Sequence, residues 1–151
     1  MRVYSQKNGS DCFVYALANA YSYLGKKQDA HFQRAFKEMR EECKNGPYLS
    51  KMGGMYKLGI AEYFQKTEHI EDLQMFGGIV ALKHPIFNLH AAFVSPVDIE
   101  RCMVYNSWLG PTEMCITWKE LFGFCRHNNC CHWKLMYGQE GYVPHGNLPQ
   151  V

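Results

Sequence analysis

Hydrophobic residues in the first part of the chain recur with the spacing of an α-helix. One stripe predicts a first helix over residues 12–24, which Gly25 ends. A second stripe predicts a helix over residues 29–43, and Asn45-Gly46-Pro47 breaks it. A third, shorter helix is predicted from Gly54 to about Lys66. This part of the sequence is therefore expected to be mainly helical.

The pattern then changes to short apolar runs bounded by turn residues, which is typical of β-strands. Pro85 falls in a predicted loop or hairpin connection over residues 83–88, and Pro96-Val97-Asp98 supplies a turn. Thr117 is a suitable cap for a short helix over residues 117–122. The predicted strands are, in chain order, residues 78–82, 89–95, 101–106, 114–116 and 132–137.

Helices followed by neighbouring strands predict an α+β fold, with the N-terminal helices packed against an antiparallel β-sheet. The chain has 151 residues, which is enough for one domain with a hydrophobic core. We expect this domain to cover residues 1–137. Residues 138–151 show little apolar periodicity and are expected to form a C-terminal tail.

Composition and charge narrow the class of protein. Hydrophobic residues make up 47% and charged residues 20%, as in an ordinary globular protein. A net charge of +2 without a dense Lys/Arg cluster argues against a nucleic-acid-binding protein. No apolar run reaches the roughly 18 residues of a membrane span, so no membrane span is expected.

The cysteines indicate the compartment. Seven is an odd number, and the first residues lack the build of a signal peptide. We therefore expect mostly reduced thiols in the cytoplasm, either of the producing cell or of a host if this is a phage or effector protein. The stretch Cys125–His132 carries residue types that bind zinc, but the adjacent Cys130-Cys131 cannot easily chelate one ion. No metal site is predicted.

Cys12 is the first candidate for catalytic chemistry. It opens the first predicted helix, which Ser10 or Asp11 can cap, and the N–H groups and dipole of a helix N-terminus favour a thiolate. The same N–H groups can bind an oxyanion, and the amide of Gln6, six positions earlier, can supply a second donor. The alternative for Cys12 is a buried, inert thiol.

A histidine and an asparagine downstream fit the remaining roles. His90 lies in the apolar run Leu89–Val94 and Asn106 ends the next predicted strand, so neighbouring strands can bring them side by side. His90 would be the general base and then the acid, and Asn106 would accept its ring N–H. The alternatives are a core histidine at position 90, with His84 as the rival base, and an ordinary turn residue at position 106.

Gln6, Cys12, His90 and Asn106 resemble the constellation of the papain-like cysteine peptidases. Within that superfamily the chain is most similar to the C39-like peptidases, which cleave double-glycine leader peptides. The similar segments are Asp11-Cys12, Tyr15–Ala20, Tyr23-Leu24-Gly25 and Thr117–Leu121. The resemblance implies a papain-like fold and a cysteine protease that hydrolyses a peptide or isopeptide bond through an acyl-enzyme. It also implies a protein or peptide substrate and no cofactor, and it leaves the oligomeric state open.

Two positions depart from the C39-like pattern. Asn106-Ser107-Trp108 stands where the leader peptidases usually carry Asp, and it is similar to the papain branch, in which the Trp shields the His–Asn hydrogen bond from water. The resemblance also places Asp11 and Trp108 at the substrate-binding site. Phe13 replaces the Gly that both branches favour after the cysteine, and its larger side chain can narrow the cleft.

The sequence leaves two alternative functions open. The same triad can carry out acyl transfer, transglutamination or deamidation of a Gln side chain, because these reactions share the acyl-enzyme. The chain can also be a papain-like scaffold that binds a partner, with Phe13 blocking the cleft. Two double glycines, Gly53-Gly54 and Gly77-Gly78, are expected to be flexible turns rather than self-cleavage sites.

Overall fold

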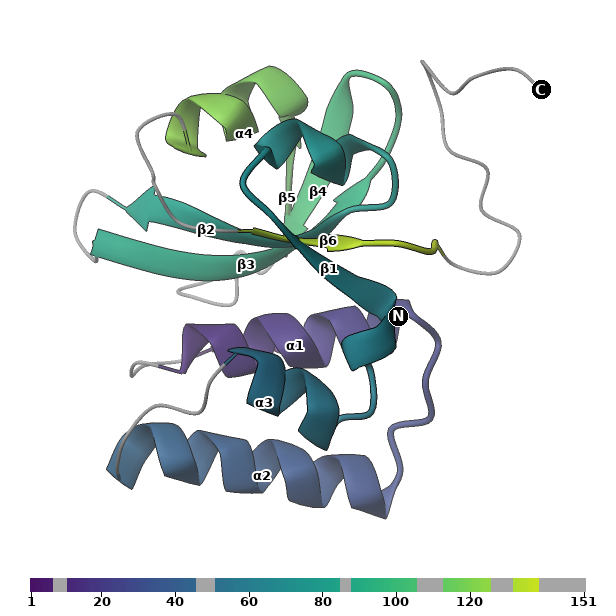
Figure 1. The fold of residues 1–151 in the computed structure, drawn as a ribbon, viewed down its shortest axis with the longest axis vertical. Coiled ribbons are helices and arrows are strands. Elements are labelled where there is room, and N and C mark those ends of the chain that lie inside the picture. Colours follow the sequence, from purple (N-terminus) through teal and green to yellow (C-terminus); the bar gives the residue numbers. More distant parts are fainter. Residues whose placement is uncertain (7–10, 46–50, 85–87, 106–112, 126–131, 139–151) are drawn as a thin grey trace.

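The computed structural model shows an α+β protein built on one six-stranded antiparallel sheet (Figure 1). The strand order is β1-β6-β2-β3-β4-β5, so β2 and β3 lie at the centre of the sheet. The predicted α+β class is therefore confirmed. The structure describes residues 1–6, 11–45, 51–84, 88–105, 113–125 and 132–138.

The first three α-helices precede the strands along the chain, as the hydrophobic pattern predicts, and the fourth lies between the last two strands. The α-helices of the described residues are α1 (Cys12–Tyr23), α2 (Ala30–Asn45), α3 (Lys51–Lys57) and α4 (Trp118–Cys125). Two 3₁₀ helices are η1 (Ala61–Tyr63) and η2 (Ile70–Gln74). The strands are β1 (Phe64–Thr67), β2 (Gly78–His84), β3 (Asn88–Pro96), β4 (Arg101–Tyr105), β5 (Glu113–Thr117) and β6 (His132–Leu135).

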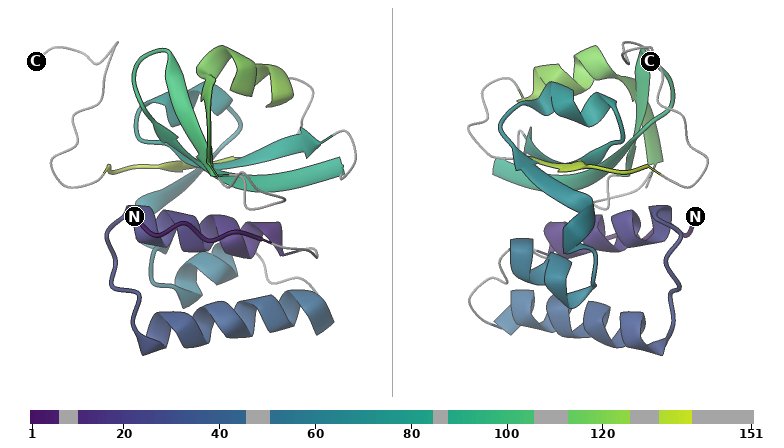
Figure 2. Two further views of the ribbon diagram at one scale, coloured as in Figure 1. Left: turned by 180° about the vertical axis from the view of Figure 1, so that it is seen from behind. Right: turned by 45° about the vertical axis from the view of Figure 1, so that its right-hand side comes forward.

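Helices cover both faces of the sheet (Figures 1 and 2). α1 lies against one face, and α2 and α3 lie on the far side of α1. α4 and η2 cover the opposite face. Two hydrophobic cores result, the first around α1 and the second under α4 and η2. Within the described ranges, no helix combines the length and apolar character that crossing a bilayer requires.

α1 is the central element of the first core. Ala16, Ala18 and Ala20 are completely buried. Their small side chains let the backbone of α1 approach the sheet on one side and α2 on the other. Tyr23, at the end of α1, packs against Phe93 of β3 with ring centroids 5.2 Å apart. The helix is therefore held closely along β3.

The register of β2 against β3 decides which side chains face which core. Ile79 pairs with Phe93, and both lie in the first core, whereas Val80 pairs with Ala92, and both lie in the second. Side chains alternate between the faces of a strand, so Ala91 shares the face of Phe93. Successive residues of β3 therefore point alternately toward α1 and toward α4.

The third helix is shorter than predicted, and a strand replaces its second half. α3 ends at Lys57, Gly59 follows with a left-handed φ of 70°, and β1 begins at Phe64. The predicted helix over residues 54–66 is therefore wrong beyond Lys57. A left-handed residue interrupts helical hydrogen bonding, and pairing with β6 stabilises the extended backbone that follows.

The connection between β2 and β3 is also shorter than the predicted loop over residues 83–88. β2 extends to His84, β3 begins at Asn88, and the register pairs these two residues. His84 is therefore the last residue of a strand. The other predicted helices and strands agree with the structure to within three residues at each end.

Thr117 caps α4, as predicted. Its Oγ1 accepts a hydrogen bond from the backbone N–H of Glu120 at 3.0 Å. In return, Oε1 of Glu120 accepts one from the backbone N–H of Thr117 at 3.2 Å. This reciprocal capping box fixes the start of α4 over the second core.

The two double glycines do not form flexible turns, so that prediction is wrong. Gly53 and Gly54 lie inside α3. Gly77 has a φ of 88°, and a Cβ there would lie 2.2 Å from the carbonyl oxygen of Val94 on β3. Gly78 is the first residue of β2. The second pair is therefore required by the close approach of neighbouring backbones.

Replacing Gly77 with Ala is expected to destabilise the fold by at least about 2 kcal/mol, because the new Cβ meets the Val94 carbonyl in a strained conformation. Gly123→Ala is the matched control, since a Cβ at Gly123 in α4 meets nothing within 4 Å. The control is expected to be neutral or slightly more stable. Urea unfolding measures both variants, and equal free energies of unfolding would contradict the close approach.

Ionisation of the Cys102 thiol is expected to lower the stability of the fold at alkaline pH. It is completely buried in the second core, and burial raises the pKa of its thiol from 9.0 to about 12. Because the pKa of this thiol is higher in the folded than in the unfolded chain, the protonated thiol stabilises the folded state fully below about pH 9. This stabilisation is lost as the pH rises toward about 12.

We expect Cys102→Val to remove this loss. The free energy of unfolding of the native protein, minus that of the variant, should fall by up to about 1.4 kcal/mol per pH unit above about pH 9. Denaturant unfolding from about pH 8 to about pH 11 measures the difference. A difference that stays constant over this range would show that Cys102 ionises as easily in the folded chain as in the unfolded one.

Candidate active site

Cys12 opens α1 and meets the strand that carries His90. Its sulfur accepts a hydrogen bond from the backbone N–H of Ala91, with 3.5 Å between Ala91 N and Cys12 Sγ. The two residues lie 79 positions apart in the sequence. Cys12 is also partly exposed. The packing of α1 on β3 therefore brings the Cys12 sulfur to the backbone N–H directly after the predicted base.

Strand pairing explains the direction of this N–H. Ala81 of β2 pairs with Ala91, and the Ala81 N–H bonds to Nδ1 of His132 at 3.1 Å, on the side away from β3. In an antiparallel pair the two residues either bond to each other or both point away. The Ala91 N–H therefore points toward the side on which β4 pairs with β3. The Cys12 sulfur lies on that side of β3, past the end of the β3–β4 ladder at which Phe93 pairs with Tyr105.

His90 is buried, with 4% of its surface exposed. It pairs with Leu82, and strand alternation places its Cβ on the face of Ala92, in the direction of α4. Cys12 packs against the first core, on the other face. The imidazole reaches the sulfur only if the ring turns over the edge of β3 toward β4. The structure thus brings the backbones together, and the contact between ring and sulfur stays a prediction.

Gln6 and Asp11 make a polar contact directly before Cys12. Gln6 is 1% exposed, and its Nε2 donates a hydrogen bond to Oδ1 of Asp11 at 2.9 Å. Asp11 occupies the N-cap position of α1, but its side chain makes no cap hydrogen bond. Of the two predicted caps, Ser10 lies outside the described residues, and Asp11 takes the N-cap position while its carboxylate accepts the bond from Gln6. This bond holds the Gln6 amide beside the start of α1, where an oxyanion donor must lie.

Asn19 fixes the N-terminal segment on α1. It is completely buried, its Oδ1 accepts from the Tyr4 N–H at 2.7 Å, and its Nδ2 donates to the Tyr4 carbonyl at 3.2 Å. Both backbone polar groups of Tyr4 are thereby satisfied, two residues before Gln6. No role for Asn19 is predicted from the sequence, although an asparagine among the alanines of an apolar helix is a signal for a buried hydrogen bond.

Asn19→Ala is expected to release the N-terminal segment and to destabilise the fold by about 2–3 kcal/mol, because the buried backbone groups of Tyr4 lose their partner. Amide hydrogen exchange should show the Tyr4 N–H exchanging at least about 10-fold faster. Gln33→Ala, at an exposed position of α2, is the control. Protection of the Tyr4 amide that survives in Asn19→Ala would contradict this role.

Several predicted site residues lie outside the described residues or have a different setting. Ser10, Asn106 and Trp108 lie outside the described residues. Asn106 follows directly on the last described residue of β4. Phe13 is partly buried and packs against the first core.

The other described cysteines differ in exposure. Cys102 and Cys125 are buried, and burial raises the pKa of Cys125 from 9.0 to about 11. The thiol of Cys125 donates to the carbonyl oxygen of Ala81 at 3.7 Å. Cys115 is exposed on β5. At neutral pH the two buried thiols are protonated and shielded, so they do not compete as nucleophiles.

No group of three or more His, Cys, Asp or Glu side chains within the described part of the chain could hold a metal ion. Of the cysteine-rich stretch, residues 126–131 lie outside that part. Its two ends, Cys125 and His132, both bond to the backbone of Ala81. These two side chains therefore serve the packing of α4 and β6 on β2.

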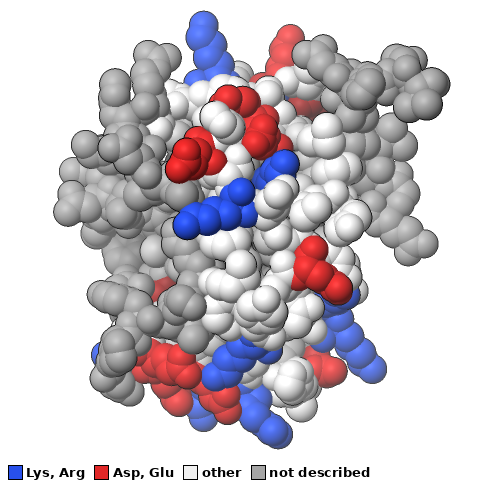
Figure 3. Space-filling view, viewed as in Figure 1, with Lys and Arg blue, Asp and Glu red and all other residues white. Residues whose placement is uncertain are grey.

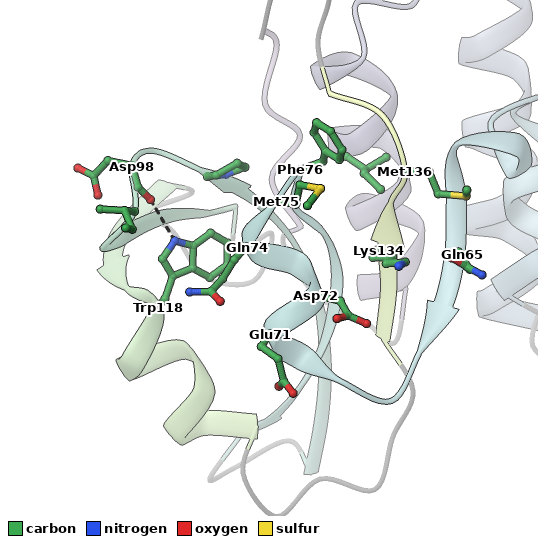
Figure 4. Close-up of a pocket in the computed structure, with 13 residues that line it drawn as sticks. Gln65, Glu71, Asp72, Gln74, Met75, Phe76, Asp98, Trp118, Lys134 and Met136 are labelled. Carbon is green, nitrogen blue, oxygen red and sulfur yellow. Dashed lines mark hydrogen bonds between the residues drawn. The ribbon is translucent and has the colours of Figure 1, made fainter. Parts of the chain in front are cut away.

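A pocket of about 390 Å³ opens beside η2 (Figure 4). At one wall the indole N–H of Trp118 donates to the carbonyl oxygen of Asp98 at 3.2 Å. Glu71, Asp72 and Lys134 also line the pocket. No motif in the sequence predicted it, because its lining residues come from separate segments: β1, η2 and the residues after it, the end of β3 and the turn that follows, α4, and the end of β6.

The pocket lies far from Cys12. Pro96, at the end of β3, lines it, whereas His90 lies six residues earlier, which is about 20 Å along a strand. The pocket is therefore separate from the candidate active site.

Lys/Arg and Asp/Glu side chains are intermixed on the face shown in Figure 3, without a field of one sign.

Comparisons of the chain with protein-family models, with curated proteins and with solved structures found no match. The structure itself shows helices packed on an antiparallel sheet. The resemblance to papain-like peptidases therefore rests on the sequence of this chain and stays a prediction.

Proposed function

We propose that this protein is a papain-like cysteine protease, similar to the C39-like peptidases, that hydrolyses a peptide or isopeptide bond. The observation that carries the proposal is the hydrogen bond from the Ala91 N–H to the Cys12 sulfur at 3.5 Å. It joins the first residue of a helix to the strand residue after His90. A helix start at the sulfur and a histidine-bearing strand beside it are two of the features that favour an activated thiol.

In the proposed reaction, the Cys12 thiolate attacks the carbonyl carbon of the scissile amide. Backbone N–H groups at the start of α1 and the Gln6 amide, which Asp11 holds in place, bind the oxyanion. The His90 imidazole takes the thiol proton and gives it to the leaving amine, while Asn106 orients the ring. Water then attacks the acyl-enzyme, and the thiol is restored.

Local electrostatics support this role for the sulfur. The Ala91 N–H points at Sγ, and a hydrogen-bond donor stabilises negative charge on its acceptor. The N-terminus of α1 acts in the same direction. Nucleophile, base and oxyanion donors are all protein groups, so the reaction needs no cofactor. A cytoplasmic location agrees with the odd number of cysteines.

Selective alkylation tests the activated nucleophile. Native protein is treated with iodoacetamide at neutral pH, and peptide mass spectrometry follows each cysteine. We expect Cys12 to react at least about 10-fold faster than Cys115, an exposed thiol that serves as internal control. His90→Ala should bring the Cys12 rate to within about threefold of the Cys115 rate. A Cys12 that reacts no faster than Cys115 in the native protein would end the proposal.

Mass spectrometry of treated peptides identifies the reaction. Hydrolysis adds one water across a backbone bond, deamidation changes the mass by about one unit, and acyl transfer joins two molecules. We expect hydrolysis by the native protein and by Cys115→Ala, and none by Cys12→Ala. Any biological effect that persists unchanged in Cys12→Ala would instead identify a binding protein.

A further inference from the structure

We propose that the pocket beside η2 is a docking site for the C-terminal segment of the same chain, residues 139–151. This segment lies outside the described residues, which end at Gly138. The proposal does not depend on the protease activity, because the pocket is separate from the candidate active site. It rests on the position of the pocket, on its exposed apolar side chains and on the point at which the segment joins it.

The register of the sheet brings the ends of three strands together at the pocket. Gly78, at the start of β2, pairs with both Lys134 of β6 and Val94 of β3. Two residues beyond these partners, Met136 and Pro96 lie at the same end of the sheet, and both line the pocket. One strand, β2, separates β6 from β3, so Met136 and Pro96 lie about 10 Å apart across the sheet.

Large apolar side chains are exposed at this pocket. Ile99 and Met136 line it and are 57% and 42% exposed. Val97 and Tyr137, which lie within two residues of them in the chain, are exposed as well. A single exposed apolar residue is ordinary, but a group of them around a concave site favours the binding of another apolar group. The volume of about 390 Å³ lies in the range of ligand-binding pockets.

The C-terminal segment begins at the rim of this pocket. Met136 lines the pocket, and residue 139 follows three positions later. The segment has thirteen residues, and Glu140 is its only Asp, Glu, Lys or Arg. Its large apolar side chains are Tyr142, Val143, Leu148 and Val151. An apolar segment with little charge is therefore joined directly to an exposed apolar site.

The segment is long enough to cross the pocket. The four residues from Gly138 to Tyr142 span up to about 14 Å, which exceeds the distance of about 10 Å across the strands. Tyr142 can therefore reach the side of the pocket on which Ile99 lies. Pro144 and Pro149 restrict the backbone of the segment, which lowers the conformational entropy that docking costs.

Attachment to the same chain lowers the affinity that docking requires. A short linker gives an effective concentration on the order of 1 mM. A segment that would bind as a free peptide with a dissociation constant of about 0.1 mM therefore occupies the pocket about 90% of the time. A modest apolar contact is thus sufficient.

The carboxylates at the pocket do not oppose this occupant. Asp98 is held by Arg101, with 2.7 Å between Oδ2 and Nη2, and Oδ2 of Asp72 accepts a hydrogen bond from the Thr67 hydroxyl at 2.7 Å. Figure 4 shows the carboxylate of Glu71 pointing away from the labelled apolar side chains. The apolar part of the pocket is therefore open to an uncharged stretch of chain.

Lys134 provides a positive charge on the side of the pocket where the segment begins. It makes no ion pair with a carboxylate of the described ranges. Figure 4 shows Lys134 between Asp72 and the strand that carries Gln65. The charge of Glu140 is opposite to that of Lys134, so electrostatics favour the first residues of the segment at this side.

Chymotrypsin treatment of the full chain tests the docking. Mass spectrometry follows cleavage after Tyr142 through the loss of residues 143–151. We expect this cleavage to be at least about 10-fold faster in Ile99→Glu than in the native protein, because a charge in the apolar pocket releases the segment. Met52→Glu, at an exposed apolar position of α3, is the matched control and should be cleaved at the native rate. Native protein cleaved after Tyr142 as fast as Ile99→Glu would overturn the proposal.

NMR of the native protein tests the contact without any variant. With isoleucine methyl groups labelled, we expect nuclear Overhauser effects between Ile99 and protons of residues 139–151, because docking brings these side chains into contact. A sample that mixes labelled and unlabelled chains shows whether the contact lies within one molecule. The absence of the contact, or a contact found only between two molecules, would overturn docking within the chain.

Alkylation of Cys12 separates this proposal from the proposed function. A chain that ends at Gly138 should keep the native rate of Cys12 alkylation to within about twofold, because the pocket is far from Cys12. Faster alkylation in the shortened chain would show that the segment covers the candidate active site instead, and would overturn the proposal. A slow Cys12 in both chains ends the protease proposal and leaves the docking site standing.

Discussion

The close approach of α1 to the central strand of the sheet is the constraint on which the rest of the structure depends. Ala16, Ala18 and Ala20 make this approach possible, because side chains without bulk let the helix backbone lie between the sheet and α2. The same packing sets the position of the first residue of α1 along β3. The N-terminal segment is then tied to α1 through Asn19, and every candidate group before Cys12 takes its place from that helix.

Charge around Cys12 is balanced by specific hydrogen bonds. Asp11 brings a carboxylate next to the candidate nucleophile, which opposes a second negative charge there. The Gln6 amide donates to that carboxylate, and the Ala91 N–H donates to the sulfur. The N-terminus of α1 favours negative charge at both positions. One helix end therefore gathers the candidate nucleophile, an amide donor and a carboxylate.

Periodicity was sufficient to predict most of the fold, because hydrophobic spacing and turn residues act locally. It failed where long-range pairing decided the structure, as at Phe64, where pairing with β6 turned a predicted helix into β1. The position of Cys12 at a helix start was predictable. Its contact with Ala91 was not, because it depends on how α1 packs along β3, and the two residues lie 79 positions apart in the sequence. The face of β3 that carries the His90 side chain was likewise not predictable. Strand alternation assigns its Cβ to the side of α4 only once the pairing of His90 with Leu82 is known.

The proposed function requires that the sulfur of Cys12 and the ring of His90 act on each other across the edge of β3. The most direct measurement is an NMR pH titration of the His90 ring in the native protein and in Cys12→Ala, with His90→Gln used to assign the signal. We expect removal of the thiol to move the midpoint of the His90 titration by at least about one pH unit, as for a coupled pair. Identical midpoints in the two proteins would contradict it.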